Sequence, residues 1–399
     1  MKNSSDHILT SHAGSLPRTP ELIAANAAKE AGESENFDQL LTASVVNLVE
    51  RQKAIGIDVP GDGEFGKSMT SAVDYGAWWS YSFDRVSGLE IDPDAAWAVE
   101  QKLSEPGNPR LTGFIHRRDR QRFAAAYADP ESGIFTGGPK PFPKVVGPLE
   151  YTGQAAIASD IANLKAGLNA AGYSEGFITA LSPGSASRIT NEHYATEEEY
   201  IWAWADALRE EYKVIIDAGL VLQIDDPSIA ENFDQIEPEP SVEDYLKFTR
   251  VRVEALNYAL RDLPEEQIRF HLCWGSWHGP HTTDFEMKHL VDLMLEINAG
   301  AYSFEAANVR HEHEWRVWED TKLPEGKLII PGIVSHATNV VEHPELVADR
   351  IERFAKLVGR ENVIAATDCG LGGRIHPEIA VAKLETLVAG AKLATERLY

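Results

Sequence analysis

Cysteine is scarce in this sequence, and long apolar runs are missing. Only two of the 399 residues are cysteine, too few for the disulfide framework that holds small secreted proteins together. No uninterrupted apolar stretch approaches the length of a membrane span. Residues 1–6 are polar, so we expect no signal peptide there. These absences favour a soluble, cytoplasmic protein.

Positive charge is also in short supply. Lysine and arginine number 37 against 62 aspartate and glutamate residues, which gives a formal net charge of −25. Such an excess of negative charge repels phosphate groups, so nucleic acid and anionic membrane surfaces are excluded as partners. A small molecule is the partner that remains, and the sequence makes no prediction of oligomeric state.

What the sequence does contain is an alternation of short apolar runs and long amphipathic stretches. This alternation is typical of parallel strands joined by helices. Eight strand-helix units would close a (β/α)₈ barrel, with a doubly wound open sheet as the alternative. We therefore predict an α/β protein with one barrel domain over residues 1–399. The predicted strands are 8–15, 57–64, 176–182, 220–225, 268–274, 301–305, 328–334 and 363–368, and clear helices are 199–218, 242–260, 285–298, 344–358 and 377–398.

The regular pattern is interrupted after the second predicted strand. Residues 66–172 hold the aromatic run Trp78-Trp79, a stretch rich in proline and glycine at 137–141, and a further candidate strand at 144–147. We interpret this span as an insertion in the barrel and not as a separate domain. An insertion at this point would leave the barrel at its C-terminal face and could cover a site there.

Polar and reactive side chains recur at the ends of the predicted strands. Because a barrel enzyme carries its chemistry at the C-terminal ends of its strands, these residues predict one shared site. A purely structural barrel would not need an acid, a histidine or a cysteine at nearly every strand end. The residues concerned are Ser15, Glu64, Asp225, His271, Cys273, Glu305, His336 and Cys369.

Three of these residues have the chemistry of a zinc site. His271 and Cys273 are two positions apart, so on a strand their side chains point to the same face. Cys369 ends a later strand, and Glu305 could supply a fourth, oxygen ligand. The alternative is that Cys273 and Cys369 are two unrelated buried thiols.

Other motifs carry less information. Residues 61–66 fit the G-x-G-x-x-G dinucleotide pattern, but Asp62 and Glu64 would direct negative charge at a pyrophosphate. The run His311-Glu312-His313-Glu314 is not the H-E-x-x-H zinc motif. His278 and His281 lie in a loop rich in glycine and proline, where we expect surface or substrate-side residues and not metal ligands.

Several of these runs together resemble the C-terminal catalytic barrel of cobalamin-independent methionine synthases. They occur in the order of that family and span nearly the whole chain. The resemblance is carried by His12 to Arg18 (HAGSLPR), Gly63-Glu64, 223–227 (QIDDP), 270–274 (FHLCW), 303–305 (SFE), Pro331 to Ile333 with Ser335-His336, and 368–371 (DCGL).

The resemblance implies a barrel with Zn²⁺ held by His271, Cys273, Glu305 and Cys369. It also implies that Ser15, Glu64 and Asp225 hold the amino-acid part of a thiol substrate such as homocysteine. His336 would lie near the reacting centre, where a histidine of ordinary pKa can supply a proton at neutral pH. The expected activity is zinc-dependent methyl or alkyl transfer to a thiol, with a methylated folate as one possible donor.

The sequence departs from the family in two respects. The long synthases carry a second barrel, whereas this chain has one, and the family's Asp-Glu-Pro is here Asp225-Asp226-Pro227. The run 304–315 resembles the short, single-barrel branch, which includes zinc enzymes that add thiol cofactors to epoxides. Addition of a thiol to an epoxide is therefore one alternative activity, and a non-catalytic protein with a structural zinc is another.

Overall fold

The computed structural model describes residues 1–33, 36–72, 74, 76–96, 103–134 and 141–399. Residues 137–140 of the predicted proline- and glycine-rich stretch lie outside the described residues. Seven parallel strands form one curled sheet in the order β1-β10-β9-β8-β7-β6-β4. The strands are β1 Leu9–Thr10, β4 Phe177–Leu181, β6 Val221–Asp226, β7 Ile268–Leu272, β8 Ala301–Phe304, β9 Leu328–Val334 and β10 Ile364–Thr367.

The second predicted strand, residues 57–64, is not a strand. The segment lies between β1 and β4 instead, in the place of the missing barrel strand. The amides of Asp58 and Val59 both donate to Thr10 O, at 3.1 and 3.0 Å, and the amide of Phe177 donates to Pro60 O at 3.0 Å. Proline has no N–H to donate, so a regular ladder is interrupted at Pro60. The sheet is therefore closed into a TIM-type barrel by an irregular segment.

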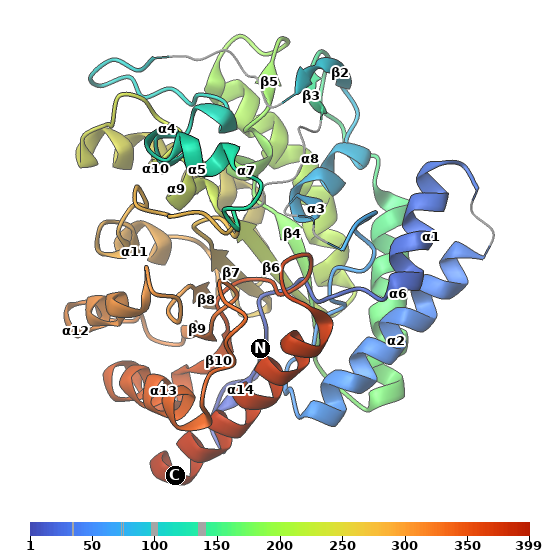
Figure 1. The fold of residues 1–399 in the computed structure, drawn as a ribbon, viewed down its shortest axis with the longest axis vertical. Helices are drawn as coiled ribbons and strands as arrows, with labels where there is room; N and C mark the ends of the chain where they lie inside the picture. Colours follow the sequence, from blue (N-terminus) through green and yellow to red (C-terminus); the bar gives the residue numbers. More distant parts are fainter. Residues whose placement is uncertain (34–35, 73, 75, 97–102, 135–140) are drawn as a thin grey trace.

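Helices surround the curled sheet, as Figure 1 shows. The predicted helices 242–260, 344–358 and 377–398 are confirmed as α10, α13 and α14. The helix predicted at 199–218 begins earlier, because Thr196 and Glu199 form a reciprocal capping box at its start. The helices are α1 Pro20–Glu30, α2 Phe37–Ile55, α6 Gln154–Ala171, α7 Pro183–Ala186, α8 Glu197–Asp217, α9 Ser228–Glu231, α10 Val242–Leu260, α11 Met287–Leu295, α12 Val317–Asp320, α13 Pro344–Val358 and α14 Pro377–Leu398, with short 3₁₀ turns at Tyr81–Asp84, Phe114–His116, Glu265–Gln267, Glu312–Arg316 and Arg360–Asn362.

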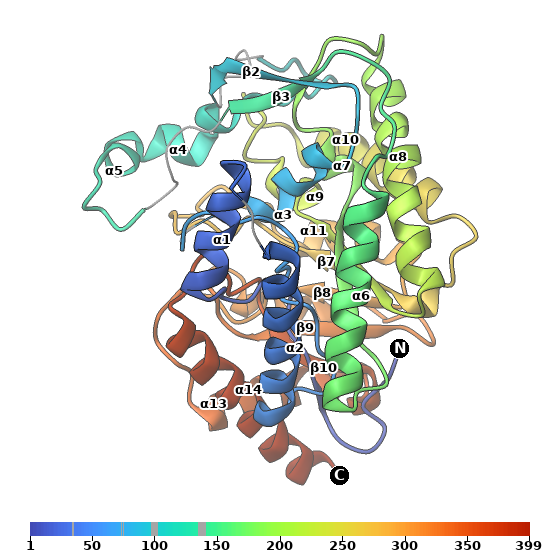
Figure 2. The ribbon, with the colours of Figure 1, turned by 90° about the vertical axis from the view of Figure 1, so that its right-hand side faces the viewer.

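The span predicted as an insertion contributes two of the three strands of a second, smaller sheet, together with several short helices. This sheet has the order β2-β3-β5, and Figure 2 shows β2 and β3 at one end of the molecule with α4 and α5 projecting beside them. Helix α6 also falls inside the predicted span, but it packs against α2 and α8 in the ring around the barrel. The elements of the insertion are α3 Ala77–Ser80, β2 Leu89–Ala96, α4 Arg118–Arg122, α5 Ala124–Ala128 and β3 Pro141–Val145. The third strand of the small sheet, β5 Thr190–Asn191, follows β4 and lies outside the predicted span.

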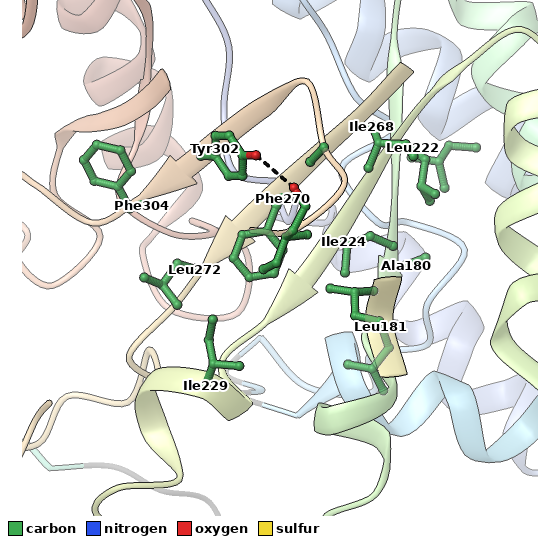
Figure 3. Packing of buried hydrophobic residues seen from close by; sticks show 14 of the residues in the cluster. Ala180, Leu181, Leu222, Ile224, Ile229, Ile268, Phe270, Leu272, Tyr302 and Phe304 are labelled. Carbon is green, nitrogen blue, oxygen red and sulfur yellow. Dashed lines mark hydrogen bonds between the residues drawn. The ribbon is translucent and has the colours of Figure 1, made fainter. Parts of the chain in front are cut away.

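The hydrophobic core lies on the sheet. Every residue of β4, β6, β7, β8, β9 and β10 is buried, as expected for parallel strands covered on both faces. Figure 3 shows Phe270 and Leu272 of β7 beside Ile224 of β6 and Tyr302 of β8. The Tyr302 hydroxyl donates to Ile297 O at 2.8 Å, which satisfies a polar group inside this apolar layer.

Candidate active site and metal centre

A cavity of about 230 Å³ lies at the C-terminal ends of the barrel strands. Asp225 is the second-to-last residue of β6, Cys273 directly follows β7, and Cys369 lies two residues after the end of β10. Their positions explain why residues so distant in sequence meet at one place. Six of the predicted site residues line this cavity: Ser15, Glu64, Asp225, His271, Cys273 and Cys369.

His271, Cys273 and Cys369 form a compact set of potential metal ligands. One ligand atom from each lies within 4.8 Å of the other two, and all three residues are buried. The two sulfurs are 3.6 Å apart, and neither cysteine is in a disulfide. His271 Nδ1 is 2.9 Å from Ser303 Oγ, while its Nε2 is buried without a hydrogen-bond partner among the described residues. This nitrogen and the two sulfurs are the donor set that zinc prefers.

The two thiols differ in acidity because they share a hydrogen bond. The interaction with Cys273 lowers the pKa of Cys369 well below its usual value, and His271 acts in the same direction. The same sulfur–sulfur interaction, together with burial, raises the pKa of Cys273. Cys369 is therefore the sulfur that loses its proton first, and a cation bound between the two would remove the proton from Cys273 as well.

Glu305 and His336 belong to a neighbouring group that also includes Asp368. Glu305 Oε1 accepts from the amide of Trp274 at 3.0 Å, and Oε2 accepts from Asn308 Nδ2 at 2.7 Å. Burial, with the charges of Cys369 and Asp368 adding to it, raises the pKa of Glu305 to about 8. The structure thus brings Glu305 beside the His-Cys-Cys set without placing it within that set, and its role as a fourth ligand stays a prediction.

The pKa of His336 is not the ordinary histidine value that we expected from the sequence. Its side chain is buried, and burial lowers its pKa to about 3. The imidazole is therefore neutral at pH 7, with Nδ1 lacking a partner in the described part of the chain. A neutral imidazole cannot itself donate the proton expected of a general acid. The predicted proton transfer requires bound substrates that raise this pKa.

Glu64 and Asp225 form a pair of carboxylates on the cavity wall. Glu64 Oε1 accepts from Thr179 Oγ1 at 2.8 Å and lies 3.6 Å from Lys67 Nζ. Asp225 Oδ1 accepts from Gln223 Nε2 at 2.6 Å. Burial and the nearby charge of Glu64 raise the pKa of Asp225 to about 7. A ligand cation placed between these acids would offset both the cost of burying the Asp225 charge and its repulsion by Glu64.

The backbone around Glu64 is specialised to hold that side chain. Glu64 has a φ of 63°, which non-glycine residues rarely adopt. Its carbonyl accepts a hydrogen bond from the buried Arg18 guanidinium. A Cβ on Gly14 would come within 2.9 Å of Glu64 Oε1, so glycine is required there. The neighbouring Ser15 carbonyl accepts from the amides of Leu371 and Gly372, which anchors this segment beside Cys369.

Sequence reasoning missed the polar layer beneath this pair of acids. Arg269 is fully buried in the middle of β7. Its guanidinium donates to Gln223 Oε1 at 2.6 Å, Ser11 Oγ at 2.9 Å and His12 O at 2.6 Å. Gln223 in turn donates to Asp225, so Arg269 fixes the amide that orients this acid. A lone arginine within an apolar run is the signal that could have indicated it.

A second feature missed by sequence reasoning is a chain of hydrogen-bonded ionisable groups with little exposure, which includes His311 and His281. Glu314 Oε2 is 2.8 Å from His311 Nδ1, and His311 Nε2 is 3.1 Å from Asp284 Oδ2. Asp284 Oδ1 is 3.2 Å from His281 Nδ1. His281 Nε2 completes the chain at the carbonyl of Trp277, 2.9 Å away. The His281 side chain is 13% exposed, so it is not the surface residue that was one of our two expectations, and the other, a substrate-side residue, stays a prediction.

The rings of His311 and His281 also pack against two tryptophans beside the site. His311 lies against Trp274 with ring centroids 4.3 Å apart, and His281 lies against Trp277 with centroids 4.0 Å apart. Nearby carboxylates raise the pKa of His281 to about 9 and that of His311 to about 10, against the opposing effect of burial. Both are protonated at neutral pH. Their ion pairs with Asp284 and Glu314 fix the two imidazole rings against Trp274 and Trp277.

The remaining wall of the cavity is aromatic and comes largely from the insertion. Trp79 packs against Phe114 and Phe142 with centroids 5.4 and 5.0 Å apart. The aromatic run Trp78-Trp79, to which the sequence assigned no role, lines the cavity. Its lining residues are Trp78, Trp79, Phe83, Phe114, Tyr127, Phe142 and Trp277, interspersed with Arg117, Arg120, Arg188 and Arg374.

Comparison with known proteins identifies the family. The family model described as the catalytic domain of cobalamin-independent synthase matches residues 158–393. The chain belongs to this family. A protein of Bacillus subtilis named YxjH and described as uncharacterized is 24% identical over 372 residues, with 90% of this chain and 86% of that protein covered. Methionine synthase of Sulfolobus acidocaldarius is 22% identical over 392 residues, with 96% and 91% covered.

Longer and structurally known members of the cobalamin-independent synthase family agree with this assignment. The 5-methyltetrahydropteroyltriglutamate–homocysteine methyltransferase of Vibrio vulnificus is 22% identical, and the match covers 96% of this chain but 41% of that enzyme. The solved B12-independent methionine synthase of Shewanella sp. W3-18-1, in complex with selenomethionine, has a TM-score of 0.70 at 19% identity, with 98% of this chain and 99% of that one covered. It shares the fold. None of the described helices is long and apolar enough to cross a membrane.

Proposed function

We propose that this protein transfers a methyl group to the sulfur of homocysteine, or of a closely related thiol, in a zinc-dependent reaction. The observation that carries the proposal is the meeting of His271, Cys273 and Cys369 on the wall of a cavity that also holds Glu64 and Asp225. A soft-metal ligand set and an acidic pair in one cavity fit a substrate that carries both a thiol and an ammonium group.

The residues present fit a zinc ion. The buried Nε2 of His271 lacks a partner among the described residues, and the two adjacent sulfurs complete a nitrogen–sulfur–sulfur set that can become anionic. Glu305 is our proposed fourth ligand. When bound here, zinc would keep the acceptor sulfur deprotonated at neutral pH and still nucleophilic.

The protein's own groups position the acceptor. Glu64 and Asp225 would receive its ammonium group through charge-assisted hydrogen bonds, and Ser15 lines the same wall. The raised pKa of Asp225, about 7, means that this acid gains from a cation placed beside it. His336 would lie near the leaving group of the donor, where substrate charge must raise its pKa before it can give up a proton.

The names of the relatives support methyl transfer over the addition of a thiol to an epoxide. Relatives named methionine synthase match nearly their whole length, and the longer one is named for a methyltetrahydropteroyl donor. We therefore propose a methylated folate as the donor and the cytoplasm as the place of action. A purely structural zinc would not require its ligands to line an open cavity.

X-ray absorption at the zinc edge tests the proposal. The zinc-loaded protein should gain one sulfur neighbour when homocysteine is added. Homoserine, which replaces the sulfur with oxygen, is the matched control and should add none. An unchanged spectrum with homocysteine would indicate a structural zinc and refute the proposal, whereas a new sulfur neighbour without methyl transfer from a methylated folate would refute the donor alone.

A further inference from the structure

Two arginines of the insertion reach the cavity with donor capacity that the protein does not use. Arg117 precedes α4 and Arg120 lies within it, and both line the cavity. Arg117 Nη2 donates to Glu231, but its Nη1 is buried without a hydrogen-bond partner among the described residues. Arg120 makes neither a hydrogen bond nor an ion pair with any of the described residues. Its guanidinium instead lies 5.4 Å from the centre of the Tyr127 ring.

The aromatic rings hold these guanidinium groups in place. Arg117 lies over Trp277 and Phe114, at 4.3 and 4.9 Å from the ring centroids. Tyr127 is itself fixed, since its hydroxyl accepts from Trp277 Nε1 at 2.8 Å and donates to Asp119 Oδ2 at 3.0 Å. An arginine whose face rests on a ring keeps its N–H edge free for a ligand.

Neighbouring arginines also form ion pairs, and Arg188 shares Glu231 with Arg117. Arg188 is paired with Glu231, and Arg118 with Glu239. Leaving a buried N–H without an acceptor is costly, so a ligand acceptor at the open Nη1 of Arg117 would be favourable. Two planar groups of five N–H donors each are well matched to a carboxylate or another oxyanion.

We propose that Arg117 and Arg120 form a subsite for a carboxylate of the methyl donor, an inference that rests on the proposed function. The acceptor's ammonium is assigned to Glu64 and Asp225 at the strand ends, whereas these arginines belong to the insertion. Trp79, Phe114 and Phe142 add an aromatic surface to the wall of the same cavity. The cavity thus fits a donor with a flat aromatic body and a carboxylate at the arginine end.

The proposal is tested by direct binding of an unreactive probe. N-(4-aminobenzoyl)-L-glutamate carries an aromatic ring and two carboxylates, and its diamide is the neutral control. With zinc-loaded, full-length protein saturated with homocysteine, calorimetry should show that the dianion binds at least about tenfold more tightly than the diamide. Arg120→Gln should abolish this preference, and Arg120→Lys should restore part of it.

Arg122 provides the matched control on the same helix. It is exposed, and its nearest polar contact is a long one of 3.4 Å to Thr282. Arg122→Gln removes the same charge and should keep the preference for the dianion. Equal binding of dianion and diamide by the wild type, or the same small loss in both variants, would overturn the proposal.

Two further outcomes separate this inference from the proposed function. Weaker binding of homocysteine by Arg120→Gln, with the probe unaffected, would assign Arg120 to the acceptor and overturn the inference alone. Arg120-dependent binding of the dianion by a protein whose zinc gains no sulfur neighbour from homocysteine would support the subsite and refute the methyltransferase proposal.

Discussion

The acid pair predicts how amino-acid binding depends on pH. Asp225 is buried beside Glu64, and its pKa is raised from 3.8 to about 7. An ammonium group is bound by the ionised carboxylate, so affinity should be full above pH 7 and should be lost as pH falls through about 7. Below this value the affinity should fall about tenfold per pH unit, because one proton must then leave for each ligand bound.

The magnitude follows from the pKa shift. A rise from 3.8 to about 7 corresponds to about 4 kcal/mol of unfavourable free energy for the charged form of Asp225. A bound ammonium group offsets part of that cost. In Glu64→Gln one source of the shift is removed, so the pKa of Asp225 should fall and the break should move to lower pH. The same variant loses a charge-assisted contact, which should weaken binding about 10–100-fold at pH 8.

Calorimetric titration with methionine measures this dependence without a titrating thiol in the ligand. The wild type should show a break near pH 7, Glu64→Gln a break at lower pH, and Asp225→Asn none in this range. The deaminated analogue 4-methylthiobutyrate is the ligand control and should show no loss of affinity as pH falls. A break that stays at the same pH in Glu64→Gln would refute the idea that the two carboxylates interact through their charges.

Substitutions at five further positions test the rest of the site. Cys273→Ser or Cys369→Ser should lose most of the bound zinc by elemental analysis while circular dichroism stays unchanged. His336→Asn should lower kcat by about 10²–10⁴-fold with zinc retained. A break near pH 6.5 in the pH profile of kcat/KM of the wild type would contradict the lowered pKa of His336. His311→Gln should lower the free energy of unfolding by about 3 kcal/mol in urea titrations. Arg269→Met should cost about 3 kcal/mol in the same assay and weaken methionine binding, with Arg269→Lys milder in both.

The barrel was predictable from sequence because its strands and helices follow simple patterns. Short runs rich in apolar residues predicted β6, β7 and β9, and amphipathic spacing predicted α10, α13 and α14 to the residue. The prediction of a strand at 57–64 was wrong because apolar residues next to a proline and two glycines resemble a strand that ends in a turn. Its place in the barrel depends on contacts with Thr10 and Phe177, which local sequence does not encode.

The site was predictable only where its residues lie at strand ends. The period of two on β7 placed His271 and Cys273 on one face, and their meeting with Cys369 is present in the structure. The supporting groups could not be found in this way. His281 and His311 are 30 positions apart, and their connection runs through Asp284, so the relay exists only in the folded chain. The lowered pKa of His336 is likewise a consequence of burial, which its neighbours in sequence do not determine.

The polar layer in the barrel links stability to chemistry. Burial lowers the pKa of Arg269 to about 9, so placing this charge inside the barrel is unfavourable unless its hydrogen bonds are met. They are met by Ser11 and His12 from the first segment and by Gln223 from β6. The first segment contributes only a two-residue strand to the sheet, and this layer ties it across the barrel. Because Gln223 also orients Asp225, the hydrogen bonds that secure the closure of the barrel also set the position of the acid that we assign to the substrate.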